Sequence, residues 1–464
     1  MTRHDLDDAA APLGANYWRL WWASLISNFG DGLSIIAYPW LASALTRNPA
    51  VIAGVLVASR LPWLLITLPA GVVTDRLDRR RLIVITDTIR FLLTLLVAAT
   101  VLISSSSLQD PTDLADGSAT TPAGAWLAIG TLYLAAFLLG CAEVFRDNSA
   151  QTLMPSLVRP AQLERANGRL GGIEMIMNSF VGPPAAGLLL AVSFSLPFFV
   201  DAATFGVAAV LLTTLRGSFT PGPGAGAASH RVDADGAGQP GAVDAFRREL
   251  AEGFAWLWRH PFLRSLAIAL GALNGLFAMT EAVQVLFVQE VLGLGALGFG
   301  AIGAAAALGG VAGSFAAPRV SAVLGQSRAL LTTVAAGIVG PALIAAFPTL
   351  PVVVAIFFGL SFTAVVWNVI TIALRQTLIP DELLGRVNSV YRFFGWGMIP
   401  IGALAGGLLV ATFEQFVERP IALRLPFAIS AAAHLLLLLY ARPRLSSERI
   451  EQAKASGTTN LSDR

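Results

Sequence analysis

Long apolar segments constrain the fold of this chain more than any other feature. A helix that crosses a membrane needs about 20 mostly apolar residues, and twelve stretches of the chain meet that requirement. They occur as six, an interruption, and then six more. The expected spans are Trp18–Leu45, Val51–Val73, Leu82–Ile103, Ala125–Val144, Ala166–Ala191, Leu196–Leu215, Phe262–Val288, Leu297–Pro318, Ala329–Phe347, Leu350–Ala373, Val387–Phe413 and Ile421–Tyr440. The pattern predicts an all-α membrane protein with twelve transmembrane helices in two six-helix halves.

The composition also indicates a membrane protein. Of the 464 residues, 55% are hydrophobic and 13% are charged, whereas a soluble globular protein has roughly 25% charged residues. The net charge of +2 is too small to indicate a nucleic-acid partner. Lys454 is the only lysine and is followed by Ala455. The chain therefore lacks a Walker A loop, which requires Gly-Lys-Ser or Gly-Lys-Thr, and cannot be its own P-loop ATPase.

Cysteine and histidine give no sign of a cofactor or a metal. Cys141 is the only cysteine, so no internal disulfide is possible. The four histidines are scattered without the spacing of a metal site. We therefore expect no metal, no cofactor and no enzymatic activity.

A short motif occurs once in each half. The sequence QTLMP at Gln151–Pro155 returns as QTLIP at Gln376–Pro380. Each copy is followed by Arg-x-Asn, at Arg165–Asn167 and Arg386–Asn388. Self-similarity in a fixed order predicts two copies of one structural unit, so the halves should be pseudo-symmetric. Each motif is expected to end an even-numbered span, the fourth or the tenth, with its proline helping to stop the helix.

The segment between the halves reads as a flexible linker, because Gly, Pro and Ala dominate it without apolar periodicity. Within it, apolar residues recur at helical spacing over 244–259, which predicts an amphipathic helix at the membrane surface. The alternative is an ordinary surface helix on a soluble linker. The expected organisation is an N-terminal tail at 1–17, a six-helix half at 18–215, a linker at 216–261, a second half at 262–441 and a C-terminal tail at 442–464.

Arginine positions predict the orientation in the membrane. Loops on the cytoplasmic side carry more basic residues than those outside. Four arginines lie between the second and third spans, and five lie in the linker and its helix, whereas the 104–124 loop has no Lys or Arg. The exceptions are Arg47, Arg419 and Arg424. Both termini and the linker are therefore expected to be cytoplasmic, in a multi-pass protein of the inner or plasma membrane without a cleaved signal peptide.

Two related halves around a cytoplasmic linker are typical of a secondary transporter with its substrate site between the halves. Ionisable residues inside spans are costly and mark functional sites. Asp31 and Glu281, on the first helix of each half, are candidates for substrate binding or proton coupling. Arg60 is a further candidate, and it is also the cation with which Asp31 would pair in a purely structural role. Asp87 and Arg90, one turn apart, are expected to pair with each other.

The tenth span supplies two more candidates. Trp367 and Asn368 lie near its middle, and we expect them to line the substrate cavity.

The segment LPAGVVTDRLDRRR, at Leu68–Arg81, resembles the signature of the major facilitator superfamily between the second and third spans. Asp78 stands where the signature has its second glycine, which puts the tight turn in question. The resemblance implies the major facilitator fold. It also implies a cytoplasmic clasp in which Asp75 faces the start of the eleventh span and favours the outward-facing state. The matching residues are Gly71, Asp75, Arg76, Arg79 and Arg80.

A second motif lies in the fifth span. VGPPAAG, at Val181–Gly187, resembles part of the antiporter motif of this superfamily, with Ala186 in place of one glycine. Gly182, Pro183 and Gly187 are therefore expected to act in conformational gating, with the two prolines bending the span. The arginine motif of drug–proton antiporters is absent from the fourth span. Over nearly the whole chain, the pattern is most similar to the enterobactin-exporter-like and macrolide-efflux-like branch.

The resemblance implies a proton-coupled exporter, an antiporter of drug or siderophore type that works by alternating access. Its partners would be a small, partly apolar substrate, protons and the lipid bilayer, and the protein would be monomeric. The alternatives are an importer of the same fold, since a fold does not fix the direction of transport, and a membrane sensor or scaffold that transports nothing.

Overall fold

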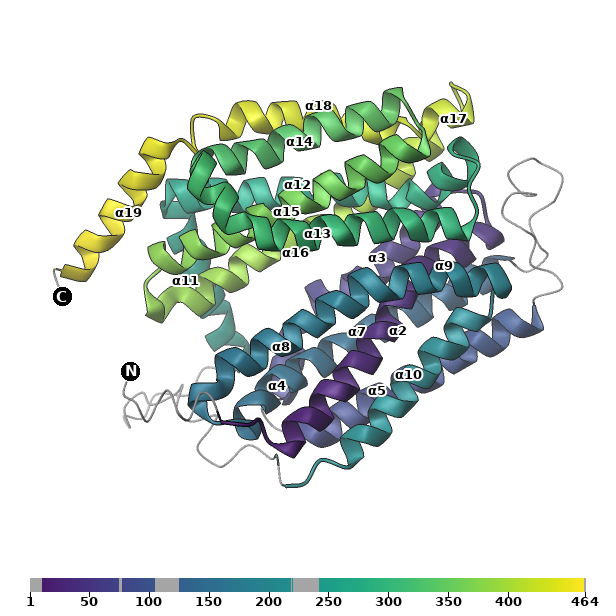
Figure 1. Ribbon diagram of the computed structural model, residues 1–464, viewed down its shortest axis with the longest axis horizontal. Helices are drawn as coiled ribbons and strands as arrows, with labels where there is room; N and C mark the ends of the chain where they lie inside the picture. Colours follow the sequence, from purple (N-terminus) through teal and green to yellow (C-terminus); the bar gives the residue numbers. More distant parts are fainter. Residues whose placement is uncertain (1–10, 75–76, 105–124, 218, 220–241, 463–464) are drawn as a thin grey trace. The chain divides into compact units, whose positions relative to one another are not determined.

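The computed structural model describes residues 11–74, 77–104, 125–217, 219 and 242–462, and all regular structure in these ranges is helical (Figure 1). By length and composition, ten of the described helices can cross a membrane, and Pro49–Leu65 is a shorter apolar helix. The first expected span lies in a helix of 31 residues. The all-α architecture predicted from the apolar segments is confirmed.

The helices of the first half lie on the expected spans, but the second span is divided into two helices at Ile66 and the fourth continues to Leu157. The fifth span contains a π-helical segment at Ile176–Val181 between two α-helices. The helices are α2 (Ala15–Leu45), α3 (Pro49–Leu65), α4 (Thr67–Thr74), α5 (Arg79–Ile103), α7 (Ala125–Leu157), α8 (Leu163–Met175), α9 (Gly182–Val192) and α10 (Leu196–Thr213).

The segment expected to be a linker contains a helix, α11, which includes the expected helix at 244–259. The second half begins after this helix. The seventh span ends in a π-helical segment at Phe287–Val291. The helices are α11 (Ala242–Arg259), α12 (Pro261–Leu286), α13 (Ala296–Leu324), α14 (Gln326–Ala346), α15 (Leu350–Leu378), α16 (Asp381–Phe413), α17 (Arg419–Ala422), α18 (Leu425–Ala441) and α19 (Ser447–Ser462).

The chain divides into two compact units. The N-terminal unit comprises Met1–Arg47, Ala58–Ala234 and Gly293–Ala304, and the C-terminal unit comprises the remaining residues. The division differs from the two halves of the sequence at two short segments. Asn48–Val57 groups with the C-terminal unit and Gly293–Ala304 with the N-terminal unit.

Glycines allow close contact between helices in each unit. In the N-terminal unit, a side chain at Gly32 of α2 would collide with the Met177 carbonyl and with Gly182. In the C-terminal unit, a side chain at Gly402 of α16 would collide with the backbone of Gly275 in α12. Small residues permit helix backbones to approach in this way in membranes, where close packing holds helices together.

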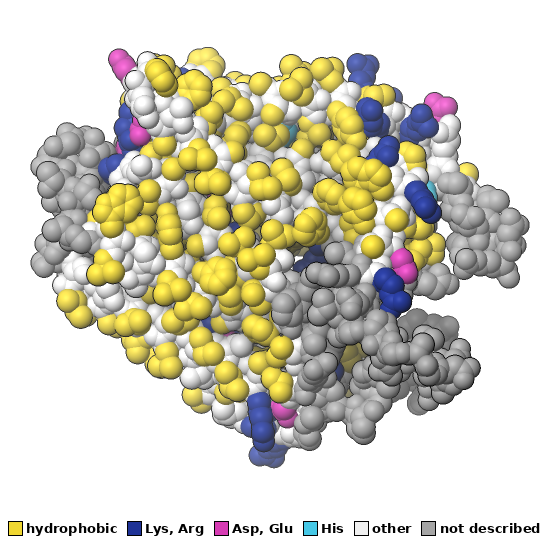
Figure 2. Space-filling view, turned by 180° about the vertical axis from the view of Figure 1, so that it is seen from behind, with side chains coloured by type: hydrophobic (Ala, Val, Ile, Leu, Met, Phe, Trp, Pro, Cys, Tyr) yellow, Lys and Arg dark blue, Asp and Glu magenta, His cyan; other side chains and the backbone are white. Residues whose placement is uncertain are grey.

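Many large apolar side chains face outward, as expected for helices that contact lipid. Examples are Ile103, Trp126 and Leu127, which are 81%, 72% and 79% exposed. Figure 2 shows hydrophobic side chains over much of one face, with most of the visible charged side chains near its margins. A soluble protein rarely exposes so large an apolar patch, and this surface therefore fits a protein embedded in lipid.

The two copies of the repeated motif differ at the proline. In the second copy, α15 ends at Leu378, Ile379 is extended, and Pro380 precedes α16, as predicted. In the first copy, Pro155 lies inside α7, which continues to Leu157. The expectation that Pro155 stops the helix is wrong in detail, because this proline falls within the final turn.

Candidate functional site

Arg90 is the centre of a buried charged cluster in the N-terminal unit. Its side chain is 2% exposed and forms ion pairs with Asp31 of α2 and with Asp87 of its own helix, α5. It also donates a hydrogen bond to Ser27 Oγ at 3.1 Å. The guanidinium lies over the ring of Phe205 in α10, with its Cζ atom 3.8 Å from the ring centroid. A cation over an aromatic face is attracted by the ring quadrupole, so three helices hold Arg90 in place.

Arg146 of α7 extends the cluster. Its Nε atom lies 3.2 Å from Asp87 Oδ1, and its Nη1 atom lies 3.3 Å from Asp147 Oδ1. Arg146 Nη2 donates to Ser24 Oγ of α2 at 3.4 Å. Asp87, which is 0% exposed, therefore lies between two arginines. The chain of charges, which we call the ionic network, links α2, α5 and α7.

The ionic network has more carboxyl groups around it than guanidinium groups. Glu143 of α7 lies within the electrostatic reach of Asp31, Asp147, Arg90 and Arg60. Asp201 of α10 lies within that of Asp31 and Arg90. At least five carboxyls (Asp31, Asp87, Glu143, Asp147 and Asp201) thus face three arginines (Arg60, Arg90 and Arg146).

Burying charge that is not compensated is expensive. Because carboxyls outnumber arginines, not all of these carboxyls can be ionised at low cost. Asp31 and Asp147 are partly exposed, so water can solvate part of the excess charge, and protons or a bound cation can neutralise the rest. The network is therefore suited to exchange protons or to bind a positively charged group.

Two of the predicted site residues lie in or beside the ionic network. Asp31 is a member, with its side chain 19% exposed, but its cation is Arg90 rather than the expected Arg60. Arg60 lies in α3, within electrostatic reach of Glu143. The predicted pairing of Asp87 with Arg90 is confirmed at 3.5 Å.

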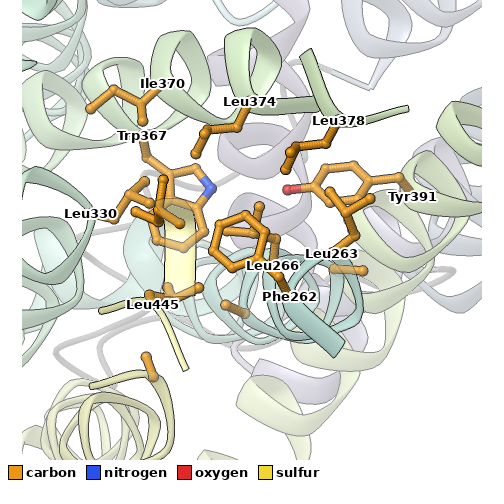
Figure 3. Close-up of a cluster of buried hydrophobic side chains, with 14 of the residues drawn as sticks. Phe262, Leu263, Leu266, Leu330, Trp367, Ile370, Leu374, Leu378, Tyr391 and Leu445 are labelled. Atoms are coloured by element: carbon orange, nitrogen blue, oxygen red, sulfur yellow. The ribbon is translucent and has the colours of Figure 1, made fainter. Parts of the chain in front are cut away.

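The remaining predicted site residues lie in the C-terminal unit. Glu281 of α12 is partly buried, and Asn368 of α15 is exposed. Trp367 is 2% exposed within a hydrophobic cluster that includes Leu330, Ile370 and Leu374. Figure 3 shows its indole nitrogen pointing toward the hydroxyl of Tyr391 across this cluster. Trp367 is thus packed as a core residue in this structure.

The signature between the second and third spans is only partly within the described residues. Asp75 and Arg76 lie outside them, whereas Gly71 is in α4 and Arg79 begins α5. Asp78, which replaces the glycine of the signature, caps α5 by accepting a hydrogen bond from the Arg81 N–H at 2.9 Å. An aspartate at a helix start satisfies a free backbone donor. The departure from the signature therefore has a local structural reason.

Arg80 also has a partner across the N-terminal unit. Its guanidinium donates to the backbone carbonyl of Thr213, at the end of α10. This arginine therefore fastens the start of α5 to the end of α10.

The fifth span is irregular at the predicted gating motif. Before Gly182, the helix adopts a π-helical register in which the Gly182 N–H binds the Met177 carbonyl. Pro183 falls in the first turn of α9 and lacks an N–H for the preceding turn. A side chain at Gly187 would collide with the Ala296 carbonyl within the same unit. The expected disturbance of the span is thus present as a π-helical segment.

Two basic residues that contradicted the arginine pattern are held by local partners. Arg419 forms ion pairs with Glu290 at 2.6 Å and with Glu414 at 2.5 Å. Arg424 donates to the Ala345 carbonyl at 2.6 Å. Their charges therefore serve the packing of α17 and α18 in the C-terminal unit.

Sequence reasoning missed four residues of the site. The fourth span was expected to end at Val144, whereas α7 continues to Leu157. That boundary left Arg146 and Asp147 outside the span, and Glu143 was not selected. Asp201 lies within the expected sixth span, so the rule that ionisable residues inside spans are functional candidates would have found it.

A helical membrane fold with buried ionisable residues is typical of a membrane transporter. The model of the Major Facilitator Superfamily matches residues 20–403, and the chain belongs to this family. It is a multi-pass transporter of the cell membrane that acts on small molecules and is not an enzyme.

Relatives and solved structures agree with this assignment. The chain is 27% identical over 403 residues to a protein named multidrug efflux pump Tap of Mycolicibacterium fortuitum, covering 83% of this chain and 87% of the relative. It is 27% identical over 405 residues to the protein of that name from Mycobacterium tuberculosis (strain ATCC 25618 / H37Rv), covering 83% and 85%.

Among solved structures, a point mutant of the nucleoside transporter NupG has a TM-score of 0.69 at 13% identity, covering 93% of this chain and 100% of that one. A bacterial homologue of the iron transporter ferroportin, in an inward-facing state, has a TM-score of 0.66 at 16% identity, covering 93% and 98%. These likenesses show the fold.

Proposed function

We propose that this protein is a proton-coupled exporter of small, partly apolar molecules that works by alternating access. The ionic network carries the proposal, because its carboxyls outnumber its arginines inside a membrane domain. Such a cluster binds and releases protons as its exposure changes. The similarity to proteins named multidrug efflux pumps supports export as the direction.

Asp31 is the coupling residue in this proposal. Asp31 is partly exposed whereas its partner Arg90 is buried, so Asp31 lies where the network meets the accessible surface. When it takes up a proton, its hold on Arg90 weakens. Glu281 of the C-terminal unit is the second candidate. Trp367 and Asn368 remain proposed substrate contacts, which in the case of Trp367 requires a state other than this packed one.

Gating is assigned to the two sequence motifs. Asp75 would clasp the start of the eleventh span in the outward-facing state, since a carboxylate is favourable at a helix N-terminus by about 0.3–1 kcal/mol. The π-helical segment before Pro183 would allow the fifth span to bend. The proposed gating residues are Gly71, Asp75, Arg76, Arg79, Arg80, Gly182, Pro183 and Gly187.

The proposed orientation places both termini and the linker in the cytoplasm, with α11 at the membrane surface and the protein working as a monomer. The arginine distribution supports this orientation. The exposed Phe254 and Trp258 of α11 support the surface position.

The test is transport by the purified protein in proteoliposomes under an imposed pH gradient. The panel should contain fluorescent lipophilic dyes, antibiotics and siderophores. We expect accumulation of at least one compound against its gradient, abolished by a protonophore. If no compound responds to the pH gradient but one responds to a sodium gradient, proton coupling is wrong. Transport in the opposite direction would favour the importer.

A further inference from the structure

Asp201 of α10 is a buried carboxyl group that forms no ion pair with any of the described residues. Its side chain is 1% exposed. One oxygen, Oδ2, accepts a hydrogen bond from Ser34 Oγ of α2 at 2.7 Å. The other oxygen, Oδ1, is buried without a hydrogen-bond partner in the described structure. Burial of an ionised carboxylate with only hydroxyl donors and no ion pair is costly, so this environment favours the neutral form.

The position of Asp201 depends on a glycine. Any side chain at Gly30 of α2 would collide with Asp201 Oδ1 and with the hydroxyl of Thr204. The Thr204 hydroxyl donates its hydrogen to the backbone carbonyl of Asp201 at 2.6 Å. The Thr204 hydroxyl is also within hydrogen-bond reach of the Asp201 side chain, where it can donate to an ionised carboxylate or accept from a protonated one.

The groups that face Asp201 come from α2 and α5. From α2 they are Asp31 and Tyr38, and from α5 the charged group is Arg90. The sequence of α9, which also packs on α10, contains no ionisable residue. Tyr38 and Asp201 are both buried, so a charge on Asp201 is shielded from bulk water.

Arg90 lies within electrostatic reach of Asp201, but its ion pairs and hydrogen bonds are made with other groups. It binds Asp31, Asp87 and Ser27. The described chain shows no ion pair between Arg90 and Asp201. Asp87 differs in its ion pairs, because it is equally buried and accepts no hydrogen bond in the described structure, yet lies within 3.5 Å of Arg90 and 3.2 Å of Arg146. One network therefore contains a carboxyl suited to remain ionised, Asp87, and one suited to hold a proton, Asp201.

We propose that Asp201 is a second proton-binding group of the transporter, linked to Asp31 through competition for Arg90. In the state described, Arg90 binds ionised Asp31 and the proton is on Asp201. When the proton moves from Asp201 to Asp31, the new Asp201 carboxylate attracts Arg90, and Asp31 becomes neutral. The two carboxyls thus share one proton and one guanidinium, and the total charge of the three groups does not change in the exchange. The proposal rests on proton-coupled transport as the function.

The partner exchange explains why both carboxyls are needed. Asp31 is 19% exposed and Asp201 is 1% exposed. A proton can therefore enter at Asp31 and be stored at Asp201, away from water. The movement of Arg90 between α2 and α10 would couple this storage to the packing of the two helices, because Arg90 also lies over Phe205 of α10.

The direct test is infrared difference spectroscopy of the full-length protein in nanodiscs during a pH titration. The wild-type protein should show the carbonyl band of a buried protonated carboxyl, shifted on exchange into deuterated water. Asp201→Asn should lose this band. Glu451→Gln, which removes an exposed carboxyl of α19, should retain it. If the band is unchanged in Asp201→Asn, the assignment to Asp201 is wrong.

Two further variants test the coupling and do not depend on the folding of Asp201→Asn. Asp31→Asn removes a neighbouring negative charge and weakens the competitor for Arg90, so the band should disappear at a lower pH than in the wild type. Ser34→Ala removes the donor to Oδ2 and should retain the band to a higher pH. If neither variant moves the pH at which the band disappears, the proposed link is overturned.

Transport separates this inference from the proposed function. In proteoliposomes, Asp201→Asn should lose pH-driven accumulation while retaining exchange between labelled and unlabelled substrate. If the wild-type protein shows no response to pH, the proposed function fails, whatever the infrared result. If the wild type responds and Asp201→Asn transports normally, only the role of Asp201 fails.

Discussion

Asp87 of α5 and Arg146 of α7 form an ion pair inside the N-terminal unit, with 3.2 Å between Asp87 Oδ1 and Arg146 Nε. Arg90 Nη1 lies 3.5 Å from the same oxygen, Asp87 Oδ1. A carboxylate shared by two buried arginines compensates part of the charge of each. This relationship makes Asp87 a structural anchor, whereas Asp31 and Asp201 are the carboxyls that can change partner.

Removal of this anchor should destabilise the protein. Asp87→Asn leaves Arg90 and Arg146 without their shared counter-charge, and breaking a buried ion pair from one side costs about 3–5 kcal/mol. We expect a large decrease in the thermal unfolding temperature in detergent. The control is Glu451→Gln, which breaks the exposed pair with Lys454 and should have little effect. Equal stability of the two variants would contradict the anchor role.

Asp31→Asn should uncouple transport from the pH gradient. The asparagine keeps the size of the side chain and can still accept a hydrogen bond from Arg90, but it cannot bind or release a proton. We expect loss of uphill transport in proteoliposomes, with substrate binding and downhill exchange largely retained. If the variant concentrates substrate at the normal rate, Asp31 is not the essential coupling residue, and Glu281 becomes the next candidate.

Gly402→Ala should disturb the packing of α16 on α12. The added methyl group would collide with the Gly275 backbone, and overpacking a core typically costs about 1–3 kcal/mol. Gly359→Ala in α15 is the matched control, because no atom lies within 4 Å of the added carbon. We expect a lower unfolding temperature for the first variant alone. Similar unfolding temperatures for the two variants would mean that α12 and α16 can move apart at this contact at little cost.

The orientation can be tested with single cysteines. In a Cys141→Ala background, a cysteine at Ser106 should react with an impermeant reagent from outside intact cells. A cysteine at Ser229 should react only after the cells are opened. Both positions lie outside the described residues, and the prediction rests on the arginine distribution. External labelling at Ser229 would reverse the proposed orientation.

His260, which precedes α12, should make stability depend on pH. Burial lowers the pKa of His260 below its ordinary value, and its ring lies 4.9 Å from that of Trp256. The unfolded chain therefore binds a proton more readily than the folded one. Stability from this group is fully present above the ordinary value of about 6.5 and is lost as the pH falls from that value through the lowered pKa of the folded state.

The measurement for His260 compares thermal unfolding at neutral and mildly acidic pH. His260→Gln removes the titrating group, so the variant should lose less stability on acidification than the wild type. Parallel losses in the two proteins would show that other groups cause the pH dependence.

The sequence by itself determined the class of protein and the order of its helices. Spans of about 20 apolar residues leave few alternatives to membrane helices, and the Leu68–Arg81 motif indicated the family. Helix ends were less predictable. The expected fourth span ended at Val144, whereas α7 continues to Leu157, and Arg146 and Asp147 each have a partner inside the unit.

The tertiary structure alone decided which charges pair. Asp31 faces Arg90 rather than Arg60, because the partner depends on which faces of α2, α3 and α5 meet, and spacing along the chain does not fix those faces. The same holds for Asp201, whose place against Gly30 depends on the close approach of α10 to α2. Apolar length is a property of each segment and can be read locally. The protonation of a buried carboxyl is a property of its neighbours, which only the packed helices define.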